Sequence, residues 1–241
     1  MSAERGATGP VGVIGGVGPL ATVYFMDKVV RLTQASRDQD HVDMVVLQHA
    51  TIPDRTEYIL GRSDDNPGPV MADDARTLER VGVSFIVVPC NTAHHFTAEV
   101  VNATSVPVLS IVDETIAEVV DHRPGTSVVG ILATSGTLAA QVYQHAAQAR
   151  GLQSVVPTDD EQAVVMRVIY DQVKAGQPAD LVALRSVVDA LVARGAQTIV
   201  LGCTELSVVA DDAALLDDPL YVDSLDVLAR RTIERTGRTV R

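Results

Sequence analysis

The sequence TIVLGCTELS at residues 198–207 has a close counterpart in FIVVPCNTAH at residues 85–94. Each segment is an apolar, β-branched run followed by a cysteine and a threonine-containing turn, which predicts a buried strand that presents a thiol at its carboxyl end. Cys90 and Cys203 are the only cysteines of the chain. Two thiols presented in the same way indicate a pair that faces one substrate, as a two-base proton transfer requires.

A second repeated segment places the cysteines in a duplicated unit. GVIGGVGPLA at residues 12–21 and GILATSGTLA at residues 130–139 share their first residue, the glycine at the seventh position and the final Leu-Ala. The offset between these segments is 118 residues (12 to 130), and the offset between the cysteines is 113 (90 to 203). The chain is therefore expected to contain two copies of one structural unit.

Short β-branched runs alternate with helical patterns along the chain, which predicts an α/β protein with parallel sheets covered by helices on both faces. The runs are continuously apolar, as expected for strands buried on both faces. Ligands bind such sheets at the carboxyl ends of the strands, so both cysteines are expected at one cleft between two units related by a pseudo-twofold axis. The predicted strands are 11–14, 44–48, 85–88, 106–109, 127–132, 153–156, 198–201 and 220–222.

The expected division places residues 1–111 and 216–241 in a first domain with Cys90, and residues 112–215 in a second domain with Cys203. The boundary is placed near residues 110–112. A last helix at 224–236 is expected to return to the first domain. Within the second domain, a helix is predicted by the spacing of Leu181, Leu184, Val188, Leu191 and Val192.

The composition excludes several classes of protein. The 241 residues are 46% hydrophobic, which is enough for a sizeable core, and carry a net charge of −12 with no Trp, three Phe and five Tyr. Such a chain repels nucleic acid, and an acidic small molecule would need local cations. We find no bilayer-spanning run, export signal or metal-ligand cysteine spacing, and expect a cytoplasmic protein with free thiols, no metal and no membrane partner.

The first glycine-rich segment allows three interpretations. GVGPLA matches the dinucleotide pattern G-x-G-x-x-A between a predicted strand and helix. The acid expected at the end of the second strand is missing, because Asp43 lies at that strand's start. The N–H groups of the turn suit any small anion, so a carboxylate is an alternative ligand, and a simple tight turn is the third interpretation.

Polar residues beside each thiol are candidates for the site. A helix beginning near Ala93 would stabilise a thiolate at Cys90, while Asn91 and Thr92 either hold a carboxylate or cap that helix. Thr204 and Glu205 follow Cys203 in the same way. Glu205 either receives a substrate ammonium, orients its thiol or simply complements the helix dipole.

Two cations are predicted near the cleft. Arg55 lies on the loop after the second strand, where a planar guanidinium suits a carboxylate or is simply solvated. Lys174 ends a helical pattern and shares a face with Tyr170; the alternative is a lysine placed only to complement a helix carboxyl terminus. Thr134 aligns with Gly16 of the first half and is expected to line the opposite side of the cleft.

The segments GGVGPLAT, PCNTAHH and LGCTEL, in this order and spacing, resemble the aspartate/glutamate racemase family, specifically its cofactor-independent aspartate racemase branch. The resemblance spans nearly the whole chain. It implies two flavodoxin-like domains with the site between them, frequently a homodimer, an amino-acid substrate, and Cys90 and Cys203 as paired acid and base without pyridoxal phosphate or metal. The substrate contacts it implies are Val17 (backbone), Arg55, Asn91, Thr92, Thr134, Tyr170, Lys174, Thr204 and Glu205.

Other functions remain open on the sequence. The same fold with one working cysteine would isomerise or decarboxylate a small dicarboxylic acid. A non-catalytic protein would bind a small anion in the same cleft. The expected function is racemisation of aspartate or glutamate, with a broader amino-acid range undecided.

Overall fold

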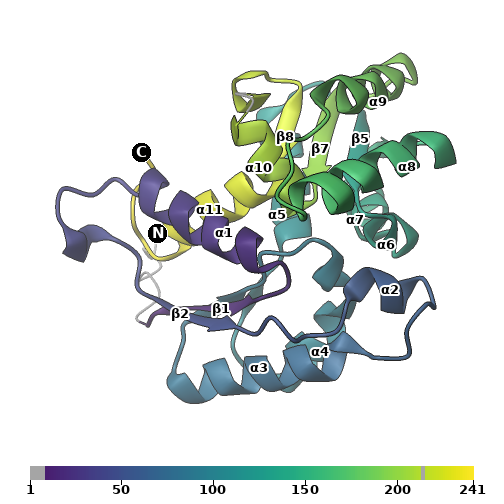
Figure 1. Cartoon of the computed structure of the whole chain (residues 1–241). Coiled ribbons are helices and arrows are strands. Elements are labelled where there is room, and N and C mark those ends of the chain that lie inside the picture. Colours follow the sequence, from purple (N-terminus) through teal and green to yellow (C-terminus); the bar gives the residue numbers. More distant parts are fainter. Residues whose placement is uncertain (1–8, 213–214) are drawn as a thin grey trace.

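The computed structural model describes residues 9–212 and 215–241 as two α/β units, each built on a four-stranded parallel sheet (Figure 1). The two sheets have equivalent strand orders, with the first strand of each unit flanked by its second and third. The first sheet runs β2 (Met44–Gln48), β1 (Val11–Gly15), β3 (Phe85–Val87), β4 (Val108–Leu109). The second runs β6 (Gln153–Val155), β5 (Val128–Ala133), β7 (Thr198–Gly202), β8 (Tyr221–Asp223).

All eight predicted strands are present, and their ends differ from the predictions by at most two residues. The β1, β3 and β7 strands are fully buried, as their continuously apolar sequences predict. The edge strands β2 and β6 are only partly buried. The predicted α/β fold class with two parallel sheets is therefore confirmed.

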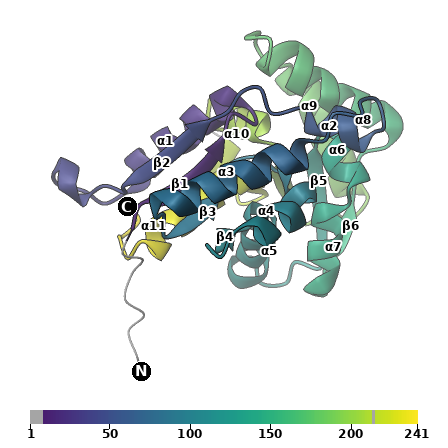
Figure 2. The same cartoon turned by 90° about the horizontal axis from the view of Figure 1, so that it is seen from below.

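Helices cover both faces of each sheet. In Figure 1, α1 lies above the first sheet and α3 and α4 lie below it; Figure 2 shows α3 crossing in front of that sheet. The helices that precede β5 in the chain are α1 (Pro19–Leu32), α2 (Arg55–Ile59), α3 (Pro67–Val81), α4 (Thr97–Ala103) and α5 (Ile111–His122). Those that follow are α6 (Ser135–Ala139), α7 (Val142–Ala149), α8 (Asp159–Met166), α9 (Leu181–Ala193), α10 (Thr204–Asp212) and α11 (Ser224–Arg235).

Four further helical segments are 3₁₀ or π helices. Two are short 3₁₀ turns at surface connections, η1 (Asp38–Asp40) and η4 (Leu215–Asp217). The other two adjoin site residues: a 3₁₀ helix, η2 (Thr92–Phe96), and a π-helix, η3 (Arg167–Val173). The helix expected to begin near Ala93 begins at Thr92 as the 3₁₀ helix η2, which continues directly into α4 at Thr97.

Each fourth strand leads into a helix that packs between the units. The α5 helix follows β4 and contacts α7 and β8, while α11 follows β8 and contacts α1 and α5. The return of the last helix to the first unit is thus present. The segment 216–241 does not belong to the first unit as a whole, however, because β8 within it pairs with β7 in the second sheet. We propose a second domain extended to β8; residues 1–8 and 213–214 of the expected division lie outside the described residues.

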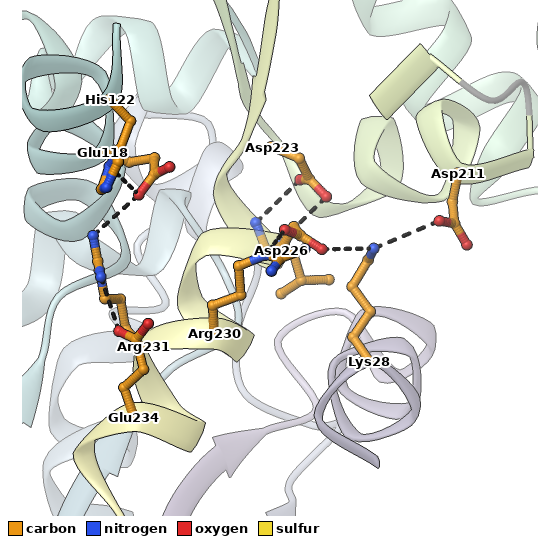
Figure 3. A network of polar contacts seen from close by, with 10 residues as sticks. Lys28, Glu118, His122, Asp211, Asp223, Asp226, Arg230, Arg231 and Glu234 are labelled. Atoms are coloured by element: carbon orange, nitrogen blue, oxygen red, sulfur yellow. Dashed lines mark hydrogen bonds and ion pairs between the residues drawn. The ribbon is translucent and has the colours of Figure 1, made fainter. Parts of the chain in front are cut away.

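Ion pairs fix α11 between its neighbours (Figure 3). The Lys28 ammonium of α1 lies 3.2 Å from Asp226 of α11 and 3.6 Å from Asp211 of α10. Lys28 is buried, so these charges are less screened than a surface pair. On the other side, Arg231 of α11 lies 3.0 Å from Glu118 of α5. The α11 helix therefore links both units.

The described residues contain no helix that is both long enough and apolar enough to span a bilayer.

Candidate active site

One small pocket between the units contains both cysteines. Its lining includes Cys90, Cys203 and all nine residues predicted as substrate contacts: Val17, Arg55, Asn91, Thr92, Thr134, Tyr170, Lys174, Thr204 and Glu205. The structure therefore brings together every predicted site residue, while the role of each stays a prediction.

The two thiols come from equivalent places in the two sheets. Cys90 follows β3 and Cys203 follows β7, and both side chains are free and buried. The two strands occupy the same position in sheets of equivalent order. The carboxyl ends of both strands therefore meet at the pocket, as expected for ligand sites in parallel sheets.

The surroundings of Cys203 favour its neutral form. Burial raises the pKa of this thiol well above its ordinary value, and the Glu205 carboxylate raises it further. The Cys203 Sγ–H donates to Glu205 Oε2 at 3.1 Å. Cys203 lies directly before α10, where a helix amino terminus favours a thiolate, but desolvation and the adjacent acid outweigh that effect here.

Lys174 places a positive charge beside both thiols. Its ammonium lies 3.8 Å from Glu205 Oε1 and 4.1 Å from the centre of the Tyr170 ring. Burial opposes the charge, but Glu205, Tyr170 and both cysteines together raise the pKa of Lys174. The π-turn between Tyr170 and Lys174 closes with Lys174 N–H donating to Ile169 C=O at 3.0 Å. Such turns are frequent at functional sites.

Arg55 is the first residue of α2, and its guanidinium is held by backbone carbonyls of the preceding loop. Its Nη1 donates to the carbonyl oxygens of Pro53 at 3.0 Å and Ile52 at 3.4 Å. Its Nε is buried and has no hydrogen-bond partner among the described residues. A buried, unpaired guanidinium N–H at a pocket wall is a donor suited to an anionic ligand group.

Threonine hydroxyls join the units at the pocket wall. Thr92 Oγ1 lies 3.0 Å from Thr134 Oγ1 and 2.8 Å from Thr137 Oγ1, and the last two lie 3.0 Å apart. All three side chains are buried. Thr92 and Thr134 thus hydrogen-bond to one another, and a ligand would share these hydroxyls with the interface.

Some backbone groups of the glycine-rich loop after β1 are already hydrogen-bonded within the protein. The Gly16 N–H donates to Thr22 Oγ1 at 3.0 Å, and that hydroxyl donates to the Gly18 carbonyl at 3.2 Å. Gly16 has φ 84°, and an added Cβ would lie 2.3 Å from the His49 backbone, so only glycine fits. Thr22 therefore stabilises the loop and takes one of its N–H groups away from any ligand.

Two further residues that line the pocket, Asp54 and Thr56, are not among the predicted site residues. Asp54 caps α2 by accepting from the Glu57 N–H at 3.0 Å. The Asp-x-x-Glu spacing before this helix was the available signal. Thr56 lies against Gly136 of the second unit, where an added Cβ would be 2.8 Å from its Oγ1. That contact joins distant segments and has no local sequence signal.

A larger groove of about 1150 Å³ lies at α9 and α10, away from both thiols. Its lining is mostly aliphatic, and it lacks the convergent polar groups of the thiol pocket. No cluster of three metal-ligating side chains occurs within residues 9–212 and 215–241. The chemistry of the molecule is therefore concentrated at the two cysteines.

This fold and this pocket define an isomerase of the amino-acid racemase class. The model of the Asp/Glu/hydantoin racemase family matches residues 14–232. The chain is 32% identical to the broad specificity amino-acid racemase RacX of Bacillus subtilis over 227 residues, covering 92% of this chain and 96% of the relative. It is also 32% identical to a glutamate racemase of Deinococcus radiodurans, covering 71% of this chain and 59% of that relative.

Among solved structures, Picrophilus torridus aspartate racemase superimposes with a TM-score of 0.80 at 28% identity, covering 97% of this chain and 96% of that one. The chain belongs to the Asp/Glu/hydantoin racemase family.

Proposed function

We propose that the protein racemises an acidic α-amino acid, aspartate or glutamate, by two-base proton transfer between Cys90 and Cys203. The observation that carries the proposal is the arrangement of two free, buried thiols from equivalent strand ends in one small pocket. Inversion at Cα needs one group to remove the proton and another to deliver a proton to the opposite face. A pair of thiols supplied by two units meets that need.

The protonation states of the two cysteines decide which one acts as the base and which as the acid. The reaction starts with one thiolate and one thiol, and the raised pKa of Cys203 makes Cys203 the thiol. In this state the Cys90 thiolate removes the α-proton, and the Cys203 Sγ–H delivers a proton to the other face of the carbanion. The reaction leaves Cys90 as the thiol and Cys203 as the thiolate.

The opposite enantiomer needs the opposite assignment. Cys203 must then be the thiolate and Cys90 the thiol, which is the state in which the first reaction leaves the pair. The Lys174 ammonium lies beside Glu205 Oε1 and close to both thiols. It favours the thiolate form of either cysteine. The same ammonium stabilises negative charge as it develops on the substrate.

Two cations at the pocket support a substrate with two carboxylates. Arg55 presents an unpaired Nε, and Lys174 presents an ammonium that is shared with Glu205. The pairing of Lys174 with Glu205 also favours a second candidate, a broader amino-acid range, because it leaves Arg55 as the cation without a carboxylate partner among the described residues that line the pocket. The name of the Bacillus subtilis relative is consistent with that range.

The deciding experiment uses purified protein in D₂O with single enantiomers of aspartate, glutamate, alanine and lysine. The α-proton is followed by NMR and the product by chiral chromatography. We expect solvent deuterium at Cα of the inverted product, with aspartate or glutamate fastest. Cys90→Ser and Cys203→Ser are each expected to lower racemisation by about 100-fold to 10,000-fold.

Undiminished racemisation by both serine variants would contradict the two-base assignment. Activity on a dicarboxylic acid without any on α-amino acids would favour the isomerase or decarboxylase alternative. Ligand binding without hydrogen exchange would leave a non-catalytic binding protein.

We also propose that the protein forms a homodimer. The α1 helix exposes Leu20, Val23 and Val30, with 57%, 56% and 48% of their surface accessible. Exposed apolar side chains aligned on one helix favour association with a second copy. Light scattering is expected to give twice the chain mass for the native protein and the chain mass for Val23→Asp; a native monomer would contradict the dimer.

A further inference from the structure

The Asn91 amide, next to the first thiol, is held by one side chain of α7 in the second unit and by one at the start of α11. The Tyr143 hydroxyl of α7 donates to Asn91 Oδ1 at 2.5 Å, and Asn91 Nδ2 donates to Ser224 Oγ at 3.1 Å. We call Tyr143, Asn91 and Ser224 the amide bridge. All three are almost completely buried, with at most 2% of their surface accessible.

The amide bridge has a defined donor order. Tyr143 O–H donates to the amide oxygen, the amide N–H donates to Ser224, and Ser224 O–H donates to the Leu201 carbonyl at 2.8 Å. Burial raises the pKa of Tyr143, so its hydroxyl stays a donor at all working pH values. The amide oxygen of Asn91 thus faces a donor and its nitrogen faces an acceptor, which fixes the amide in one orientation.

The same residues contact the strand that carries the second thiol. Leu201, which accepts from Ser224, stands two residues before Cys203 in β7. The Tyr143 ring packs against Gly202, where an added Cβ would lie 2.8 Å from Cε2. The amide bridge therefore includes the residue after Cys90, and it contacts both residues that precede Cys203.

We propose that Tyr143 and Ser224 are positioning residues that set the separation of the two thiols across the substrate α-carbon, acting through Asn91. This inference rests on the proposed racemase function. It also gives Asn91 a different principal role from substrate binding, since its amide oxygen and one amide hydrogen are used inside the protein. A two-base reaction is sensitive to this separation because each thiol must reach the same carbon from its own side.

The test measures two rates on one substrate in D₂O. The first is formation of the deuterated opposite enantiomer, and the second is deuterium entry into the recovered starting enantiomer. When the thiols are misaligned, one thiol still removes the proton, but delivery from the other side fails. The ratio of exchange to inversion then rises, whereas a smaller fraction of folded enzyme lowers both rates and leaves that ratio unchanged.

Tyr143→Phe keeps the ring and removes only the hydroxyl, and Ser224→Ala removes the second partner. Each is expected to lower kcat by about 10-fold to 100-fold with little change in KM, and to raise the ratio of exchange to inversion. The matched control is Tyr221→Phe, which removes the hydroxyl of another buried tyrosine that lies in the groove at α9 and α10. Its kcat and its ratio are expected to equal those of the native enzyme.

The double variant separates coupled from independent effects. Because both side chains act through Asn91, the loss in the double variant is expected to be smaller than the product of the single losses. If the native enzyme is active and the ratio of exchange to inversion is unchanged in both single variants, the positioning role is overturned and the proposed function stands. A native enzyme that neither exchanges nor inverts any amino acid overturns the proposed function itself.

Discussion

His94 and Ser207 stand four residues after Cys90 and Cys203, and both reach the start of the helix that follows the fourth strand of their unit. His94 Nδ1–H donates to the Cys90 carbonyl at 2.9 Å, and its Nε2 accepts from the Ile111 N–H of α5 at 3.2 Å. Ser207 donates to Asp223, the residue that caps α11. Both halves therefore contain a contact from this position to the start of the following helix, but one uses an imidazole and the other uses a hydroxyl and a carboxyl group.

The difference gives the two halves opposite responses to pH. Burial lowers the pKa of His94, so this half prefers a neutral imidazole and resists protonation. Burial raises the pKa of Asp223 to about 6, so the other half prefers a neutral carboxyl and resists ionisation. Equivalent contacts in a duplicated fold therefore share geometry but contain groups that titrate with opposite effects on stability.

The largest expected effect is that of His94→Phe. This change leaves the Cys90 carbonyl and the Ile111 N–H buried without their partner, at a cost of about 2 to 5 kcal/mol in the free energy of unfolding. The unfolded state binds more protons at His94 below about pH 6.5, so native stability falls on acidification and the gap to the variant narrows. Urea unfolding at pH 7.5 and 5.5 measures both effects.

His95→Phe is the matched control, since His95 is exposed. Its free energy of unfolding is expected to stay within about 0.5 kcal/mol of the native value. Equal losses in the two variants, or a gap for His94→Phe that does not narrow in acid, would show that the buried contacts of His94 carry no special weight.

The next effect concerns Asp223→Asn. Because the folded pKa of about 6 lies above the ordinary 3.8, the folded state binds more protons between these values, and native stability falls as the pH rises through this window. Two pKa units correspond to about 3 kcal/mol. Asparagine does not ionise, so we expect the variant to gain about that much relative to native protein between pH 4 and pH 7.

Urea unfolding at several pH values between 4 and 7 checks this expectation. Asp159→Asn, at an exposed acid in the first turn of α8, is the control and is expected to follow the native curve. Parallel curves for native protein and Asp223→Asn would contradict an ionisation cost at Asp223.

The sequence predicts the fold well because its signals are local. Eight apolar, β-branched runs bounded by turn residues give eight strands, and the two repeated segments give two equivalent sheets. Parallel strands direct their carboxyl ends to one edge, so residues that follow β3 and β7 are brought together. That rule is enough to gather the predicted site residues at one pocket.

Contacts between distant segments are what the sequence does not reveal. Asn91 and Ser224 are 133 residues apart, and neither has a neighbouring motif that pairs it with the other. The raised pKa of Cys203 depends on burial, which outweighs the helix start that its sequence position suggests. The 3₁₀ and π segments beside Asn91 and Lys174 likewise depend on packing and not on local propensity.

The smallest expected effect tests the residue two places after each thiol, which is Thr92 in one half and Glu205 in the other. Glu205 raises the pKa of Cys203 through its charge and its hydrogen bond, and Lys174 opposes this. Glu205→Gln removes the negative charge and leaves Lys174 unopposed, so the pKa of Cys203 falls. A fall of one unit gives about tenfold more thiolate at a fixed pH below the pKa, and alkylation accelerates by about that factor.

The measurement is the rate of iodoacetamide labelling at Cys203, followed by mass spectrometry from pH 7 to 10. Cys90 in the same sample is the internal reference, and Glu99→Gln, at an exposed acid of α4, is the matched control variant. We expect the labelling curve of Cys203 alone to move to lower pH, because Glu205 contacts only that thiol among the two. An equal shift at Cys90 would mean that the two halves share one electrostatic environment, and the chemical difference between their thiols would then not arise from Glu205.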